Sequence, residues 1–151
     1  MMKKVYIDTN IFDYVALKNV TYGKACKEIL DDIGTILDAS CSFLVPIEIL
    51  GSLSEISVKT ANKALLGFFS FKLNLIEIDE KLVLSASKIS EKDKINGYDA
   101  IHVAAMKKEK IKTTITENYD DFKKVKNIEI VRPLDYRKWK TSRTTTTEEK
   151  D

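Results

Sequence analysis

The sequence has little of what several classes of protein require. It contains one histidine, His102, and two cysteines, Cys26 and Cys41. A zinc site built from clustered imidazoles or from four thiolates is therefore excluded, and so is a disulfide framework. No apolar run approaches the ~20 residues of a membrane span, and no charged, apolar and small-residue segment marks a secretion signal. We expect a cytoplasmic protein with reduced thiols and no membrane partner.

An excess of charge of one sign is missing as well. The 151 residues include 25 Lys and Arg against 23 Asp and Glu, which gives a net charge of +2. This balance gives no strong sign of nucleic-acid binding. The length and the 44% of hydrophobic residues suffice for one domain with its own core. We assign residues 1–136 to that domain and residues 137–151 to a polar C-terminal tail, which we expect to fray from residue 144 onwards.

Short β-branched segments alternate along the chain with segments of helical periodicity. We predict strands at residues 4–7, 42–45, 74–78, 113–115 and 128–131. We predict helices after Asn10, from Pro46, and at residues 22–38, 59–71, 80–95 and 98–110, with a turn at 118–122. This alternation predicts an α/β fold with a mostly parallel central sheet covered by helices.

Acidic residues fall where the predicted strands end or the predicted helices begin. Ligands of a parallel α/β sheet bind beyond the carboxyl ends of its strands, so the topology can gather these residues at one edge. The positions are Asp8 after the first strand, Glu48 after the second, Asp99 at a helix start, and Asp120 with Asp121 after the fourth strand.

Each acid also has a structural explanation when it is taken alone. Asp99 can cap a helix or interact with its dipole, and Glu48 can be a solvated helix residue. Asp8 is harder to explain in this way, because it lies at the end of an apolar strand, flanked by Ile7 and Ile11, and needs a partner to offset its desolvation. Several carboxylates that face one another either raise one another's pKa or need a cation between them. Mg²⁺, which prefers oxygen ligands, fits better than Zn²⁺ or copper and suits phosphodiester chemistry.

Five segments carry a resemblance to a known family, in an order and spacing typical of it. They are residues 5–11 (VYIDTNI), 45–50 (VPIEIL), 98–105 (YDAIHVAA), 114–122 (TITENYDDF) and 130–133 (IVRP). Together they resemble a PIN domain, most of all the VapC-type toxin ribonucleases. The resemblance implies a three-layer α/β/α fold and a Mg²⁺- or Mn²⁺-dependent endoribonuclease. It further implies an RNA substrate, an antitoxin protein as partner, and a homodimer.

The resemblance also implies roles for particular residues. Many members of the family have Asp where this chain has Asn118, so we assign the fourth acid to Asp121. We prefer Asp121 to Asp120 because the apolar Phe122 should be anchored in the core and fix its neighbour. Asp121 would hold water or a second ion rather than act as a primary ligand. The implied catalytic and metal-binding residues are Asp8, Glu48, Asp99 and Asp121, and the supporting residues are Thr116, Asn10 and Asn118.

Other functions are compatible with parts of the same sequence. A non-catalytic PIN module that binds RNA or a protein would have no use for mutually repelling acids. A PIN nuclease of housekeeping RNA processing would share every motif. A haloacid dehalogenase-like phosphatase needs a second Asp two residues after the first, where this chain has Asn10.

Three features outside the acids also bear on function. We interpret His102 as a residue of packing or of a local hydrogen bond, although it could be a general base. Trp139, in a basic segment, could stack on an RNA base or form a docking contact. The apolar residues of the helix at 59–71 are many for one face, which either supports a homodimer or means that they fill the core; they are Leu65, Leu66, Phe68, Phe69 and Phe71.

Overall fold

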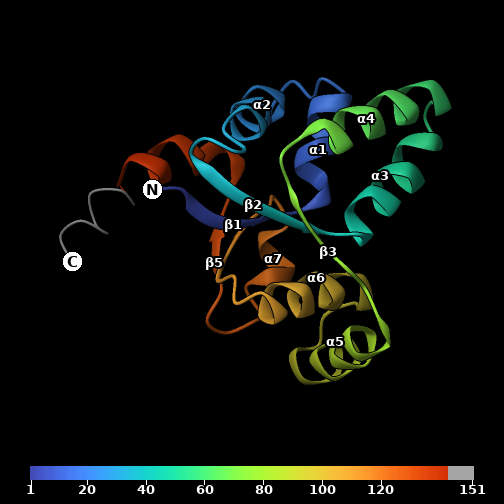
Figure 1. The fold of residues 1–151 in the computed structure, drawn as a ribbon, viewed down its shortest axis with the longest axis vertical. Coiled ribbons are helices and arrows are strands. Elements are labelled where there is room, and N and C mark those ends of the chain that lie inside the picture. The colour runs from blue at the N-terminus through green and yellow to red at the C-terminus, as the bar shows by residue number, and fades with distance from the viewer. Residues whose placement is uncertain (143–151) are drawn as a thin grey trace.

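The computed structural model describes residues 1–142, which form a five-stranded parallel sheet covered by helices (Figure 1). The sheet order is β3-β2-β1-β4-β5, and every neighbouring pair of strands is parallel. The α/β fold expected from the sequence is confirmed. The frayed segment expected at 144–151 lies outside the described residues. The strands are β1 (Lys3–Ile7), β2 (Leu37–Ser42), β3 (Asn74–Ile76), β4 (Thr113–Ile115) and β5 (Glu129–Val131).

Helices cover both faces of the sheet and make three layers (Figure 1). One layer contains α1 (Thr9–Ala16), α2 (Gly23–Asp31), α3 (Leu44–Ser54) and α4 (Val58–Ser70). The opposite layer contains α5 (Glu80–Asp93), α6 (Gly97–Lys108) and the short α7 (Tyr119–Phe122). Within residues 1–142, no helix combines the length and the apolar character that a membrane crossing requires.

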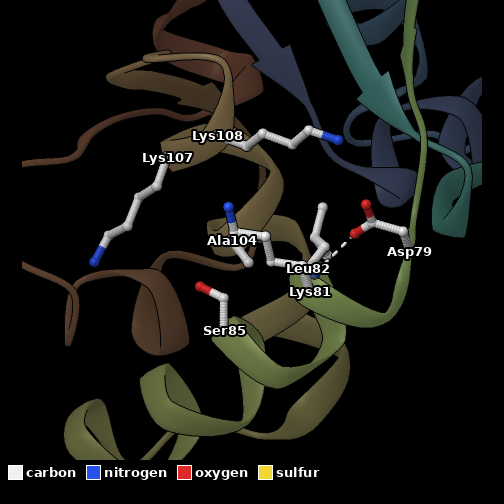
Figure 2. Close-up of a pocket in the computed structure, with 7 residues that line it drawn as sticks. All are labelled: Asp79, Lys81, Leu82, Ser85, Ala104, Lys107 and Lys108. Atoms are coloured by element: carbon white, nitrogen blue, oxygen red, sulfur yellow. Dashed lines mark hydrogen bonds between the residues drawn. The ribbon is translucent and has the colours of Figure 1, made fainter.

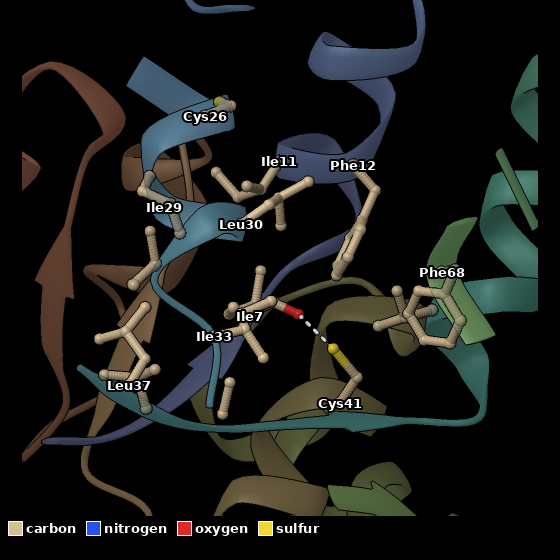
Figure 3. Packing of buried hydrophobic residues seen from close by; sticks show 14 of the residues in the cluster. Ile7, Ile11, Phe12, Cys26, Ile29, Leu30, Ile33, Leu37, Cys41 and Phe68 are labelled. Atoms are coloured by element: carbon tan, nitrogen blue, oxygen red, sulfur yellow. Dashed lines mark hydrogen bonds between the residues drawn. The ribbon is translucent and has the colours of Figure 1, made fainter. Parts of the chain in front are cut away.

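Two apolar clusters hold these layers together. Val5 and Ile7 of β1 pack with the α1–α4 layer, whereas Tyr6 between them packs with the α5–α6 layer, as the alternation of a strand requires. Figure 3 shows the first cluster, in which Cys41 Sγ donates to the backbone oxygen of Ile7 over 3.3 Å. Both cysteines are buried and free. This packing fixes the carboxyl ends of β1 and β2, where the acidic residues follow.

The segment from residue 22 to 45 differs from the prediction. The expected helix at 22–38 stops at Asp31, because Gly34 turns the chain with a φ of 88°. Leu37 then begins β2 by pairing with Lys3. The strand expected at 42–45 therefore begins five residues earlier and ends at Ser42, and α3 already begins at Leu44. Apolar residues at 33, 36 and 37 fit either a helix face or a strand, and pairing with β1 decides between them.

Residues 136–142 form a helix that packs on α2. Tyr136 Oη donates to Asp32 over 2.7 Å, and Lys140 Nζ donates to the same carboxylate over 2.8 Å. Arg137 pairs with Glu28. Trp139, which could have been free to stack on a nucleobase, instead packs against the first cluster and donates from Nε1 to Glu129. The boundary of the domain at residue 136 stays a prediction.

Candidate functional site

Asp8 lies directly after β1 and is held by three donors. The backbone N–H of Thr9 donates to Oδ1 over 2.8 Å, which makes Asp8 the N-cap of α1. Thr116 Oγ1 donates to Oδ2 over 2.7 Å, and Asn10 Nδ2 donates to the same oxygen over 3.2 Å. Ile7 of β1 pairs with Ile115 of β4. Asp8 and Thr116, the next residues along these neighbouring strands, therefore lie side by side at their carboxyl ends. These donors offset the desolvation of the Asp8 side chain, which is 8% exposed.

Glu48 reaches the same place from α3. Its Oε1 accepts from Thr9 Oγ1 over 2.6 Å and lies 2.8 Å from His102 Nε2. The same ring nitrogen lies 3.5 Å from Asp8 Oδ1. One ligand atom from each of Asp8, Glu48 and His102 lies within 4.8 Å of the others. The structure therefore brings the first two predicted acids together and adds a histidine from α6.

Asp99 lies in the first turn of α6, one helical turn before His102. Its backbone N–H donates to Asn96 Oδ1 over 3.0 Å. Its Oδ2 accepts from Asn96 Nδ2 over 2.8 Å and from Asn118 Nδ2 over 3.4 Å. Burial, and then the charge of Asp8, raise the pKa of Asp99 to about 6. Asn118 thus faces this site with an amide that donates a hydrogen bond, where a carboxylate would add repulsion.

Asp121 and Asp120 lie on α7, at the margin of the site. Asp121 pairs with Lys124 over 3.7 Å, and Asp120 pairs with Lys123 over 3.4 Å. The Asp120 side chain is 90% exposed and that of Asp121 is 38% exposed. The charge of Asp121 is one of the causes that raise the pKa of Asp99. The structure does not bring Asp121 into the group of Asp8 and Glu48, and its role stays a prediction. Phe122 is fully buried, as expected.

The carboxylates in and around the site differ in the direction in which their surroundings shift the pKa. Burial raises the pKa of Glu48, but the hydrogen bond with His102, the charge of His102 and the hydrogen bond from Thr9 together lower it by more, so its pKa lies below the ordinary value. Burial also raises the pKa of Asp13 to about 6, against a hydrogen bond from Ser52, and the charge of Glu48 adds to the rise. Glu48 therefore stays ionised more easily than Asp99 or Asp13.

Asp13 is an acid of this neighbourhood that the sequence reasoning missed. It lies on α1, and its Oδ2 accepts from Ser52 Oγ over 2.9 Å. Its Oδ1 is buried without a hydrogen-bond partner among residues 1–142. The only signal in the sequence is its position one and a half turns after Asp8, which does not distinguish it from an ordinary helix residue.

The donor set fits a hard divalent cation. In the part of the chain that the structure describes, Glu48 Oε2 and Asp99 Oδ1 accept no hydrogen bond, and neither is a fully buried atom. These oxygens, together with Asp8, offer carboxylate ligands from three separate elements. Carboxylate oxygens suit Mg²⁺ or Mn²⁺. The buried, mutually repelling acids also gain most from a positive charge between them.

A separate hollow lies at the opposite end of α6 and has different chemistry. It encloses about 410 Å³ between α5 and α6, near Lys81, Lys107 and Lys108 (Figure 2). Its one carboxylate, Asp79, accepts from the backbone N–H of Leu82 and caps α5. No acid of the candidate site lines this hollow, so the acids at the strand ends remain the candidate site.

Comparisons with known proteins concern most of the chain. A family model described as "PIN domain" matches residues 5–128. The structure is similar to VapBC2 of Rickettsia felis, solved with a promoter DNA fragment, with a TM-score of 0.67, 19% identity and coverage of 86% of this chain and 98% of that chain. It is also similar to DNA-bound VapBC of Salmonella typhimurium, with a TM-score of 0.66, 18% identity and coverage of 88% and 99%.

A third similar structure is a toxin described as cleaving the sarcin–ricin loop, VapC20 of Mycobacterium tuberculosis. The TM-score is 0.63, the identity 16%, and the coverage 73% of this chain and 86% of that chain. A comparison with curated proteins found no match. With identities of 19%, 18% and 16%, the similarity to these three solved structures establishes the fold alone.

Proposed function

Because this chain belongs to the PIN domain family, we propose that it is a divalent-metal-dependent endoribonuclease that hydrolyses phosphodiester bonds of RNA. We propose further that it is the toxin of a VapBC-type toxin–antitoxin pair and that it acts in the cytoplasm. The observation that carries the proposal is the meeting of Asp8 and Glu48 at the carboxyl ends of the parallel strands, with Asp99 near enough for the charge of Asp8 to raise its pKa.

We assign Asp8, Glu48 and Asp99 as the residues that hold Mg²⁺, or Mn²⁺ in its place. When bound, the ion would activate water and neutralise charge on the scissile phosphate. Thr116 and Asn10 orient Asp8 by donating to its Oδ2. Thr9 donates to Oε1 of Glu48, and His102 Nε2 lies 2.8 Å from the same oxygen, so that Oε2 stays open. Asn96 and Asn118 hold Asp99 by the same kind of contact. Each acid is therefore oriented before an ion arrives.

The test is cleavage of a labelled RNA by the purified protein with Mn²⁺, with EDTA as the metal-free reference. Asp8→Asn should reduce cleavage by at least 100-fold, because it removes a ligand charge, which costs more than the 10–100-fold typical of an outer contact. Asp31→Asn is the matched control, since Asp31 forms an exposed pair with Lys27 on α2. Equal cleavage by wild type and Asp8→Asn would overturn the assignment.

The proposed partners are a second copy of the chain and an antitoxin protein. Support for an antitoxin comes from the VapBC complexes to which the structure is similar. Support for a protein interface comes from apolar side chains that α3 and α4 leave exposed, among them Ile47, Leu66 and Phe69. A neighbouring reading frame that encodes a small DNA-binding protein would distinguish a toxin from a nuclease of housekeeping RNA processing.

A further inference from the structure

Arg132 extends the row of side chains at the carboxyl ends of the strands. Ile115 of β4 pairs with Val131 of β5, and the backbone N–H of Thr116 donates to Val131 O over 3.0 Å. Arg132, the next residue after β5, therefore lies beside Thr116, which in turn donates to Asp8. Neighbouring strands lie about 5 Å apart, so the backbone of Arg132 is about 10 Å from that of Asp8 along this edge.

Tyr119 lies next to the same site, at the start of α7. The residue before it, Asn118, donates to Asp99 Oδ2 over 3.4 Å. Tyr119 is 41% exposed. Two cations approach its ring, since Arg132 Cζ lies 5.6 Å and Lys123 Nζ lies 5.7 Å from the ring centroid. An exposed aromatic ring with two cations beside it therefore adjoins the acids.

Arg132 keeps hydrogen-bonding capacity beyond its ion pair. Its Nε and Nη2 donate to the two carboxylate oxygens of Glu117, and Glu117 also accepts from Tyr22 Oη over 3.3 Å. A guanidinium has five N–H donors, so three remain after this pair. The Arg132 side chain is 45% exposed, which lets an anion from solution reach these donors.

Single-stranded RNA fits this pair of side chains better than duplex RNA does. Unpaired bases stack on aromatic rings, and this contact tolerates any base. Arginine binds phosphate through its paired N–H donors. Acids repel every phosphate that no cation neutralises, so the RNA backbone beside the scissile phosphate needs a positive charge outside the metal site. Arg132 supplies that charge, and Tyr119 supplies the ring.

We infer that Tyr119 and Arg132 form a substrate-binding subsite for single-stranded RNA beside the acids. An unpaired base stacks on Tyr119, and a phosphate next to the scissile one binds Arg132. Glu117 limits the positive charge of this subsite, because its carboxylate pairs with the same guanidinium. The inference rests on the proposed function, since it places the RNA of that reaction, and it adds that the RNA is unpaired where it meets Tyr119.

Binding of a fluorescently labelled single-stranded RNA tests the role of the ring. Anisotropy is measured in EDTA, so that the RNA stays intact. Tyr119→Leu should weaken binding by about 5–30-fold, because the stacking of one base is lost, whereas Tyr119→Phe should stay within about twofold of wild type. Both variants should bind the same RNA annealed to its complement as wild type does, because paired bases do not stack on the ring. An equal loss for single strand and duplex, or no loss, would overturn the inference.

Two substitutions at the ion pair test the role of charge. Arg132→Gln should weaken binding and make the slope of log K against log salt shallower by about 0.7, the value for one phosphate contact on a single strand. Glu117→Gln should tighten binding at low salt by about two- to fivefold, because it removes the carboxylate that competes for Arg132. Arg137→Gln is the matched control, since Arg137 forms a similar pair with Glu28 of α2, and it should change neither quantity. An ion pair that only stabilises the fold predicts no gain for Glu117→Gln, and that result would contradict the subsite.

The outcomes separate this inference from the proposed function. If wild type cleaves RNA with Mn²⁺, and Tyr119→Leu and Arg132→Gln keep both its RNA affinity and its KM, the subsite is wrong and the nuclease proposal stands. If wild type does not cleave but both variants bind RNA more weakly than it does, the subsite stands and the nuclease proposal falls. If wild type neither binds nor cleaves RNA, both fall. Thermal unfolding verifies that each variant is folded, and if Tyr119→Leu is not, the gain expected for Glu117→Gln decides the question.

Discussion

We expect Asp99→Asn to stabilise the metal-free protein while it weakens metal binding. Asp99 is a buried residue, 8% exposed, and burial together with the charge of Asp8 raises the pKa of its carboxyl from 3.8 to about 6. A group with a raised pKa stabilises the fold when it is protonated, and this stability is lost as the pH rises from about 4 through about 6. At pH 7.5 the ionised Asp99 therefore lowers the free energy of unfolding.

The expected change in the free energy of unfolding follows from the raised pKa of Asp99. A rise from 3.8 to about 6 corresponds to at most about 3 kcal/mol between the two protonation states. Solvent reaches Asp99 Oδ1 and screens part of this cost, and the dipole of α6 favours a negative charge in its first turn. We therefore expect Asp99→Asn to raise the free energy of unfolding at pH 7.5 by about 1–1.5 kcal/mol, or Tm by about 2–6 °C. Asparagine keeps a carbonyl oxygen to accept from Asn96 and Asn118.

Urea unfolding in EDTA at pH 5 and pH 7.5 measures this difference. The gain should be largest at pH 7.5 and should shrink at pH 5, where Asp99 of the wild type is mostly protonated. Asp120→Asn is the matched control, because its side chain is 90% exposed and its removal should change neither value. A destabilised Asp99→Asn, or a gain that is the same at both pH values, would refute the reasoning.

Three further predictions concern binding, catalysis and assembly. The Mn²⁺ affinity of the wild type should fall as the pH drops through about 6, because protons compete for Asp99; calorimetry at pH 5.5 and 7.5 tests this, and equal affinities would contradict it. Asp121→Asn should lower Mn²⁺-dependent RNA cleavage by about 10–100-fold. Asp120→Asn should cleave normally, and the reverse ranking would show that the fourth acid is misassigned. The protein should be a homodimer at tens of micromolar, because α4 exposes Leu66 and Phe69; a monomer mass of 17.2 kDa by light scattering would rule this out.

The sequence predicts the order of elements well because most of them have local signals. Asn96 caps α6 and Ser57 caps α4, and both helices begin within a residue of where periodicity places them. The segment at 33–37 has no such signal, because its apolar residues suit a helix face and a strand equally. The choice there depends on hydrogen bonds to β1, which are contacts between residues far apart in the chain, and Lys3 pairs with Leu37.

The sequence predicts those residues of the site that come directly after a strand. Asp8 and Thr116 lie side by side because β1 and β4 are neighbouring strands. The topology of a parallel sheet already suggests such an arrangement. His102 is different, because helical spacing relates it to Asp99, whereas its hydrogen bond goes to Glu48, 54 positions away. Tyr6 likewise reads as an ordinary buried strand residue until the fold places its hydroxyl against the ring of His102.

Asp8 serves the fold and the site at once, and this determines which substitution is informative. Its Oδ1 accepts from Thr9 N and caps α1, so Asp8→Ala would lose a cap worth about 1 kcal/mol together with the charge. Asparagine is as good an N-cap as aspartate and keeps an oxygen for Thr9. Asp8→Asn therefore removes the negative charge and leaves the helix start intact. A loss of RNA cleavage in a variant of unchanged Tm would then report on the chemistry of the site alone.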